Sequence, residues 1–435
     1  MNSLEAVSPL DGRYFHKVNP HLSPYFSEMA LMKTRVEVEI EYLIALLILN
    51  KDKPKEEWRQ IYMGFKEFDA QSIKLFEADC KHDVKAVEYF LRTKIDKKYH
   101  PWIHFGLTSQ DINQTALPLL LHRFNHDKMI PKILSLIESL WRLNKNTKDT
   151  IMLSRTHGQP ASPTSLGKEM MVFMERLRIQ FHKLEDFKFT AKLGGAVGNF
   201  NAHYAAFPNH NWGTWANHFI KSLGLNRTQI TTQIEPYDNL AEYCQLIARV
   251  NTIFTDLVKD IWTYISMNYF KLNIEVGEVG SSTMPHKVNP IDFENAEGNL
   301  GVANALLNHF AAKLPISRLQ RDLTDSTVTR NLGVAFGHSY LAYSSILSGL
   351  KKLAVNPDKI RQDLEMNWVV VAEGIQTILR RDGMEDAYEK LKKLTRNNIY
   401  IGPVEIEKWV EELDITEDVK TEILALTPFN YKGDI

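Results

Sequence analysis

The feature that most constrains this fold is the stretch 238–267, where apolar residues recur every three or four positions without a break. This spacing predicts one helix, and about 30 residues at 1.5 Å each make a rod of roughly 45 Å. Because apolar side chains lie on more than one side, such a rod needs partner helices within the chain or between subunits. Similar patterns predict further long helices at 27–49, 129–146, 164–188, 292–314 and 325–355. Since no convincing alternating strand pattern accompanies them, the sequence predicts an all-α protein with a central bundle of long helices.

A chain of 435 residues is too long for a single hydrophobic core. The last long helical pattern ends at residue 355, Asn367 and Trp368 mark a boundary, and short helical segments with a charged surface follow. The length suggests two or three domains. With three, we expect an N-terminal helical domain at 1–110, the long-helix bundle at 111–366, and a small C-terminal helical domain at 367–435.

Composition excludes several classes of function. The formal net charge is −1, so no global field favours nucleic acid or a membrane surface, and an anionic ligand must be met by locally placed cations. The two cysteines have no metal-ligand spacing, which fits a reducing compartment. The first residues lack a secretion signal, and the longest aliphatic run, Leu43 to Leu49, is too short to span a bilayer. We expect a cytoplasmic protein without nucleic-acid or membrane partners.

The stretch from Gly280 to Pro290 concentrates chemistry in a segment with little regular structure. It carries two hydroxyls, an imidazole, an ammonium group and a carboxamide, punctuated by glycine and proline and flanked by long helical patterns. A polar loop held between rigid helices is a frequent place for substrate binding. A solvated connector is the alternative for a loop of this composition.

Two helix starts offer polar groups. Asp83 is placed to cap a helix, with His82 beside it as either a surface residue or a substrate contact. Thr108 or Ser109 can begin another helix with Asp111 in its first turn, which makes either a good cap or an anion site.

Two irregular segments complete the candidates. The stretch 154–163 interrupts the helical pattern and reads as a loop that carries Arg155 and His157 between two long helices. The stretch 192–199 is rich in glycine but matches no nucleotide-binding motif, so it predicts a tight turn that could touch a ligand.

The residues from Gly280 to Pro290 resemble the GSSxMPxKxNP signature of the fumarase/aspartase superfamily. Further motifs are similar to the adenylosuccinate lyase family, in order and across nearly the whole chain. The stretch 281–299 resembles one bacterial branch of that family. They lie at 8–14, 82–84, 108–113, 155–160 and 321–326.

The resemblance implies a three-domain fumarase/aspartase-like fold, assembled as a homotetramer whose active sites each draw on three subunits. It implies a lyase of purine biosynthesis that needs no cofactor. Its reaction would release fumarate by β-elimination from adenylosuccinate, giving AMP, and from the succinylated aminoimidazole carboxamide ribotide (SAICAR), giving the free carboxamide ribotide (AICAR).

The resemblance also assigns roles to residues. His157 would be the general acid and Ser281 the general base, within a signature loop that spans 277–290. Lys287 and Asn289 would hold the succinyl portion, Thr108 and Ser109 a carboxylate, and Gln233 the substrate. Phosphate and nucleotide contacts would come from Arg13, Tyr14, Arg321, Ser326 and Arg330, and the remaining binding candidates are His82, Asp83 and Asn295. Arginine suits a phosphate because its planar fork binds two oxygens.

Other functions remain open on the sequence alone. A sister lyase such as argininosuccinate lyase, fumarase or aspartase would share the signature loop, although the motifs around Arg13 and His157 and the phosphate-binding arginines disfavour it. A superfamily member retained as a structural protein would not need an intact Ser281, His157 and Lys287. A helical protein-binding scaffold would need no such polar constellation.

Overall fold

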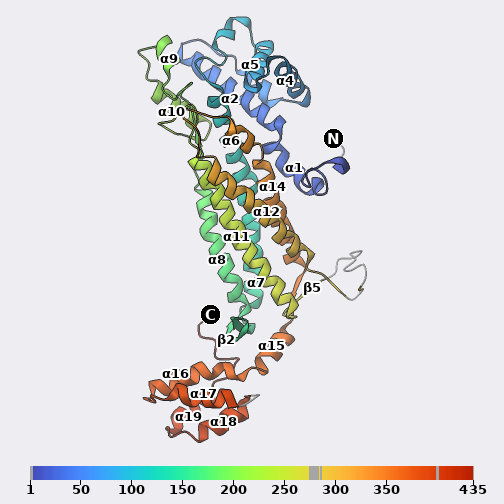
Figure 1. Cartoon of the computed structure of the whole chain (residues 1–435), viewed down its shortest axis with the longest axis vertical. Coiled ribbons are helices and arrows are strands. Elements are labelled where there is room, and N and C mark those ends of the chain that lie inside the picture. Colours follow the sequence, from blue (N-terminus) through green and yellow to red (C-terminus); the bar gives the residue numbers. More distant parts are fainter. Residues whose placement is uncertain (1–2, 274–283, 285–286, 398–400, 435) are drawn as a thin grey trace. The chain divides into compact units, whose positions relative to one another are not determined.

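The computed structural model describes residues 3–273, 284, 287–397 and 401–434, and these are predominantly helical (Figure 1). The all-α class is confirmed. The N-terminal helices are α1 (Phe15–Phe26), α2 (Glu28–Leu49), α3 (Arg59–Met63), α4 (Glu67–Cys80) and α5 (Asp83–Lys94). The long helices are α6 (Ser109–Phe124), α7 (Ile130–Thr147), α8 (Leu166–Glu185), α11 (Asp238–Ser266), α12 (Ile291–Lys313) and α14 (Leu332–Lys352). Shorter helices are α9 (Asn201–Ala206), α10 (Trp212–Ser222), α13 (Thr324–Thr329), α15 (Pro357–Glu365), α16 (Ala372–Arg381), α17 (Ala387–Asn397), α18 (Pro403–Glu411) and α19 (Glu417–Leu424).

The chain folds into two compact units. The first contains residues 1–134, 179–255 and 296–344, and the second contains 135–178, 256–295 and 345–435. The division into three domains at residues 110 and 366 stays a prediction. Within the described ranges, no helix combines the length and the apolar composition that crossing a membrane requires.

In the first unit, α2 packs against α4, α5 and α6 (Figure 1). Ser27 caps its start by accepting a hydrogen bond from the backbone N–H of Ala30 at 3.1 Å. Most of the helix is buried, including the polar residues Thr34, Arg35, Glu37 and Glu39. Helix α2 is therefore enclosed on several sides, and each of its buried charges needs a partner.

The long helix predicted at 238–267 is confirmed as α11, and the helices expected at 27–49, 129–146, 164–188 and 292–314 are also present within a few residues. The prediction of a single helix at 325–355 is wrong. The chain instead forms α13, breaks at residues 330–331, forms α14 and ends in a short strand.

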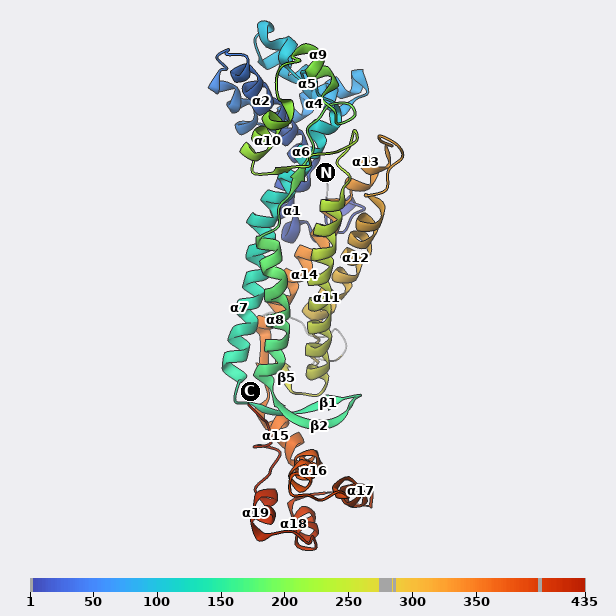
Figure 2. The same ribbon diagram turned by 90° about the vertical axis from the view of Figure 1, so that its left-hand side faces the viewer.

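Three small two-stranded sheets accompany the helices of the described chain. Strands β1 (Ile151–Thr156) and β2 (Gln159–Ser165) are antiparallel and belong to the second unit (Figure 2). In the first unit, β3 (Thr190–Ala191) pairs in parallel with β4 (Asn226–Arg227). In the second unit, β5 (Phe270–Leu272) pairs antiparallel with β6 (Leu353–Val355).

The β1–β2 hairpin overturns the expectation of an irregular loop at 154–163. Its turn consists of His157 and Gly158, which have φ values of 53° and 75°. Two left-handed residues form the tight turn that matches the twist of paired strands. Pro160 and Pro163 are tolerated because each strand of a two-stranded sheet is an edge, where a missing N–H can face away from the ladder.

A polar network in the interior of the first unit joins α11, α12 and α14. The fully buried Asn251 donates from Nδ2 to Asn304 at 2.9 Å and to Ser339 at 3.0 Å. Its Oδ1 accepts a hydrogen bond from the hydroxyl of Tyr343 at 2.7 Å. Because every polar atom of this side chain is satisfied, the network fixes how the three helices pack.

We expect Asn251→Leu to lower the free energy of unfolding by roughly 2–4 kcal/mol, because it leaves several polar groups without partners. Tyr343→Phe, which removes one hydrogen bond, should cost about 1–2 kcal/mol. Urea unfolding followed by circular dichroism measures both. The exposed Asn308→Ala on α12 serves as the control, and an Asn251→Leu variant as stable as the wild type would contradict the role of the network.

Candidate active site

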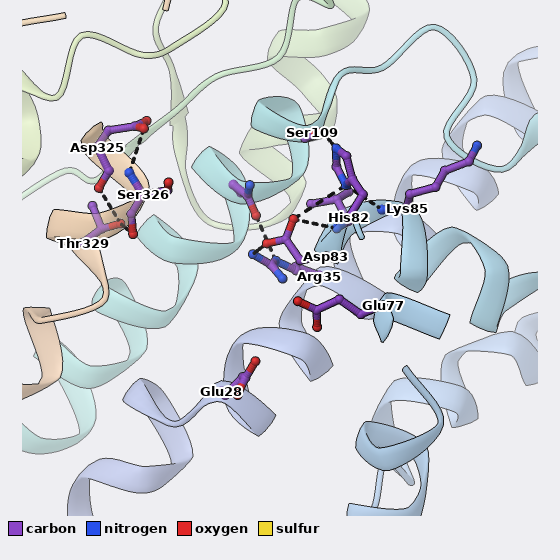
Figure 3. A network of polar contacts seen from close by, with 12 residues as sticks. Glu28, Arg35, Glu77, His82, Asp83, Lys85, Ser109, Asp325, Ser326 and Thr329 are labelled. Carbon is purple, nitrogen blue, oxygen red and sulfur yellow. Dashed lines mark hydrogen bonds and ion pairs between the residues drawn. The ribbon is translucent and has the colours of Figure 1, made fainter. Parts of the chain in front are cut away.

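His82 caps the start of α5, which corrects the prediction that Asp83 is the cap. Its Nδ1 accepts a hydrogen bond from the backbone N–H of Lys85 at 3.2 Å, and Nε2 lies 3.3 Å from the hydroxyl of Ser109 (Figure 3). Because Nδ1 is an acceptor, the proton of the neutral ring sits on Nε2, which donates to Ser109. Ser109 can therefore direct its own hydroxyl hydrogen toward a ligand oxygen.

Asp83 is the first residue of α5 and pairs with Arg35 of α2. Arg35 Nη2 lies 2.7 Å from Asp83 Oδ2 (Figure 3), and Arg35 Nε donates to Asn113 Oδ1 on α6 at 2.8 Å. Burial opposes ionisation of Asp83, but the charge of Arg35 and the hydrogen bonds from Arg35 and from the backbone of Val84 outweigh it, so the pKa of Asp83 lies below its ordinary value. One guanidinium thus fastens α5 to α6.

The start of α6 follows the predicted pattern, with Thr108 at the cap position and Asp111 in the first turn. The backbone N–H of Thr108 donates to Asp111 Oδ2 at 2.7 Å. The carboxylate of Asp111 is fully buried, and the ammonium group of Lys192 lies 2.8 Å from its Oδ1. The N–H groups of Gly194 and Gly195 donate to the same carboxylate at 2.8 Å and 3.1 Å.

The stretch 192–199 forms the predicted tight turn. Gly195 and Gly198 have φ values of 77° and 82°, which a residue with a side chain rarely adopts. A Cβ at Gly198 would lie 2.3 Å from the backbone oxygen of Thr231, so only glycine allows this approach. Gln233 Nε2 donates to the backbone oxygen of Ala196 at 3.0 Å. The turn therefore contacts both the start of α6 and the segment that carries Gln233.

Arg321 belongs to a second polar group, at the start of α13. Its Nη2 lies 3.9 Å from Asp325 Oδ1. With the side-chain amide of Gln110 oriented so that its oxygen faces the guanidinium, this oxygen accepts a hydrogen bond from Arg321 Nη2 at 2.5 Å. Asp325 also accepts from the hydroxyl of Tyr237 at 2.9 Å and from the backbone N–H of Ser326 at 2.7 Å. Burial first, and then the charge of Asp325, raises the pKa of Tyr237.

Some of these groups line a pocket of about 110 Å³ in the first unit. Three predicted binding residues line it: Asp83, Ser326 and Arg330. Among its other lining residues are Arg35, Gln110, Asn113 and Tyr237. The pocket therefore joins α2, α5, α6 and α13, which are far apart in the sequence.

The N-terminal motif lies beside Arg330. Ser8, Leu10 and Asp11 line a neighbouring pocket of about 230 Å³ together with Arg330. Arg13 and Tyr14 follow in the turn that leads into α1, where the N–H of Tyr14 donates to the backbone oxygen of Pro9 at 2.9 Å. Arg330 thus connects the N-terminal motif to the pocket.

The other candidates belong to the second unit. His157 is exposed at the turn of the β1–β2 hairpin, and Lys287 is also exposed. The backbone oxygen of Asn289 accepts from the N–H of Ile291 at 2.9 Å, at the start of α12. Asn295 Oδ1 accepts from the hydroxyl of Ser345 at 2.9 Å. Ser281 lies outside the described residues.

Sequence reasoning missed Arg35, Lys192 and Gln110. A charged residue among the apolar positions of a buried helix was the available signal for Arg35. The glycines that follow Lys192 predicted a turn but not the carboxylate that Lys192 meets.

Comparison with known proteins defines the class first. A family model described as Lyase matches residues 15–304, and a second, described as Adenylosuccinate lyase C-terminal, matches residues 317–432. The fold is shared with a fumarate lyase from Mesorhizobium sp. BNC1, at a TM-score of 0.76 and 19% identity over 96% of this chain and 95% of that chain. A 3-carboxy-cis,cis-muconate lactonizing enzyme from Pseudomonas putida gives a TM-score of 0.77 at 19% identity over 96% and 94%. The chain is a lyase of the fumarase/aspartase superfamily.

Its relatives define the family. An adenylosuccinate lyase from Dictyostelium discoideum is 52% identical over all of this chain and 98% of the relative. The adenylosuccinate lyases of Legionella pneumophila (strain Corby) and Escherichia coli (strain K12) are 47% and 46% identical over all of this chain and 97% of each relative. The chain belongs to the adenylosuccinate lyase family, and its likeness is not restricted to bacterial members.

We expect Asp83→Asn to lower the free energy of unfolding at pH 7 by about 2 kcal/mol, because the buried guanidinium of Arg35 would lose its anion. The pKa of Asp83 is lower in the folded protein than in the unfolded chain. Its stabilising contribution is therefore present above the unfolded pKa of about 4 and is lost as the pH falls through the folded pKa.

Urea unfolding at pH 7, 5 and 3.5 measures the effect. The difference between wild type and Asp83→Asn should be largest at pH 7 and should shrink at the lowest pH. Asp79→Asn, at an exposed position of α4, is the matched control. A difference that stays constant over this range would show that Asp83 contributes nothing through its charge.

Proposed function

We propose that the chain releases fumarate by β-elimination from adenylosuccinate, giving AMP, and from SAICAR, giving AICAR. The observation that carries this proposal is 52% identity to an adenylosuccinate lyase over the whole chain. The motifs that the sequence shares with this family include every group that the chemistry requires.

The reaction needs a base and an acid. The base removes the proton from the carbon beside a succinyl carboxylate, the electron pair forms the double bond of fumarate, and the C–N bond breaks. The acid protonates the departing nitrogen. We assign Ser281 as the base. We assign His157 as the acid, because imidazole side chains titrate near neutral pH. The assignment of Ser281 rests on its place in the signature motif.

The negative charge that develops on the succinyl carboxylate needs fixed donors and cations. We assign Lys287 and Asn289 to this role, with Thr108, Ser109 and Gln233 as further hydrogen-bond donors. The hydrogen bond from His82 to Ser109 supports this assignment, since it leaves the hydroxyl hydrogen of Ser109 available for the carboxylate.

The nucleotide end requires cations for its phosphate. We propose Arg321 and Arg330 for this role, with Ser326, Arg13 and Tyr14 around them. Arg330 and Ser326 already share one pocket, and Gln110 and Asp325 orient Arg321. We also place Asp83 and Asn295 near the ligand.

The chain forms a homotetramer in this proposal, and each active site combines residues of three subunits. In the single chain, the long helices expose large apolar side chains, which supports burial against other copies. They are Leu134 and Trp141 on α7, Met171, Val172 and Ile179 on α8, Trp262 on α11, and Ile291 and Val302 on α12.

We expect wild type to convert adenylosuccinate, and His157→Ala and Ser281→Ala each to lose roughly 10²–10⁴-fold in kcat, because each removes one proton-transfer group. The ultraviolet absorbance change on mixing with adenylosuccinate measures turnover, and light scattering checks the assembly. Wild type that is inactive on adenylosuccinate but cleaves argininosuccinate would replace the proposal with the sister lyase. Full activity in Ser281→Ala would overturn the assignment of the base.

Shared active sites predict complementation between inactive variants. We expect a mixture of His157→Ala and Ser281→Ala, dissociated and reassembled together, to regain part of the wild-type activity, because some sites then receive both intact residues. Each variant treated alone is the control and should stay inactive. A fully active monomer in light scattering would contradict the assembly.

A further inference from the structure

The ion pair between Asp111 and Lys192 has no role in the steps above. Both side chains are completely buried, with 2.8 Å between Lys192 Nζ and Asp111 Oδ1. Lys192 also donates to the backbone oxygen of Gly195 at 2.5 Å. Burying two charges costs free energy that their mutual attraction recovers only with good geometry and further hydrogen bonds. A pair placed directly behind Thr108 and Ser109 therefore suggests a function at the start of α6.

The electrostatic consequence follows from the position of Asp111. A helix N-terminus attracts anions because its free N–H groups carry partial positive charge. A carboxylate in the first turn neutralises this partial positive charge and repels a second anion. The ammonium group of Lys192 cancels the charge of Asp111, so the start of α6 remains able to receive the carboxylate of a ligand.

Lys192 is the cation that lies against the carboxylate of Asp111. Arg227 is a second cation that Asp111 attracts, but its guanidinium donates to the backbone oxygen of Leu193 at 2.9 Å and to Asn217 Oδ1 at 3.1 Å. Burial lowers the pKa of His203 to about 4, so its ring is neutral at pH 7. The remaining titratable groups near Asp111 are Tyr42 and His104, and His104 is engaged by Glu39 at 2.5 Å.

The same pair holds the glycine turn in place. Asp111 accepts from the N–H groups of Gly194 and Gly195, while Lys192 binds the oxygen of Gly195. Within this glycine turn, the backbone oxygen of Ala196 accepts a hydrogen bond from the side chain of Gln233. Displacing the ion pair would therefore move Gln233 as well as the start of α6.

We propose that Lys192 is a positioning residue for the fumarate half of the substrate: it neutralises Asp111 and fixes the glycine turn, so that Thr108, Ser109 and Gln233 bind a carboxylate. The inference rests on the function proposed above for these three residues. It distinguishes the two ends of the substrate, because the nucleotide end is held by Arg321, Ser326 and Arg330.

The test measures the binding of fumarate and of AMP separately, by isothermal titration calorimetry on the assembled protein. Lys192→Gln keeps a hydrogen-bond donor on a side chain one atom shorter but removes the charge. We expect its affinity for fumarate to fall roughly tenfold, with its affinity for AMP unchanged within about twofold. Lys192→Met, which loses the hydrogen bonds too, should lose at least as much affinity for fumarate. Lys221→Met, at an exposed position of α10, is the matched control and should bind both ligands as wild type does.

The outcomes separate this inference from the proposed function. Equal losses of fumarate and AMP affinity would show that Lys192 only supports the fold, and would overturn the inference. Unchanged fumarate affinity in Lys192→Gln would overturn it as well. Wild type that binds fumarate but does not turn over adenylosuccinate would instead overturn the proposed function. If Lys192→Met does not fold, as judged by circular dichroism, Lys192→Gln carries the comparison by itself.

Discussion

The candidate site of the first unit depends on the first two turns of α6. Four polar side chains follow one another there at positions 110, 111, 113 and 114, and each reaches a different part of the chain. Their partners are, in order, Arg321, the glycine turn with Lys192, Arg35, and the backbone of Glu235. Gln110, Asp111 and Gln114 are 2%, 0% and 3% exposed, so an unmet hydrogen bond at any of them would be costly. The backbone of Gln114 departs from helical geometry, with φ −87° and ψ 17°. Because one short segment holds all four partners, their positions are coupled and cannot vary independently.

Helix α2 is also held by polar side chains that reach different elements, but here the side chains are charged. Residues 35, 37, 39 and 41 are all charged, and each pairs with another element of the first unit. The pairs are Arg35 with Asp83, Glu37 with Arg123, Glu39 with His104, and Glu41 with Arg59. Residues 35 and 39 share one face of the helix, and residues 37 and 41 share another, so these pairs fasten α2 on two sides. Apolar packing alone is not directional, and the charged pairs add the specificity that fixes the pocket between α2, α5 and α6.

The sequence predicts the long helices well because their periodicity is local and extends over many residues. It fails at the β1–β2 hairpin, since prolines at 160 and 163 hide the alternation and the turn residues His157 and Gly158 are not the usual asparagine and glycine. The candidate binding residues were predicted from motifs. The residues that position them were not, because Arg35 and Lys192 act through partners 48 and 81 positions away in the chain and carry no local pattern. The pairing of these buried charges, Arg35 with Asp83 and Lys192 with Asp111, is visible only in the folded chain.

The two kinds of candidate residue occupy different structural settings. Several groups proposed to bind the substrate, among them Thr108, Ser109 and Ser326, sit at helix starts, and Gln233 contacts the glycine turn. A rigid frame of this kind suits recognition. His157 instead occupies the turn of a two-stranded hairpin with φ 53°, a conformation that costs an ordinary residue about 1–2 kcal/mol and that asparagine or glycine adopts more easily. A histidine at such a position points to a need for its imidazole rather than to turn geometry. The exposed hairpin also gives that imidazole no fixed partner within its own turn. If His157 is the proton donor that we propose, other segments must complete the site around it, as active sites shared between subunits would do.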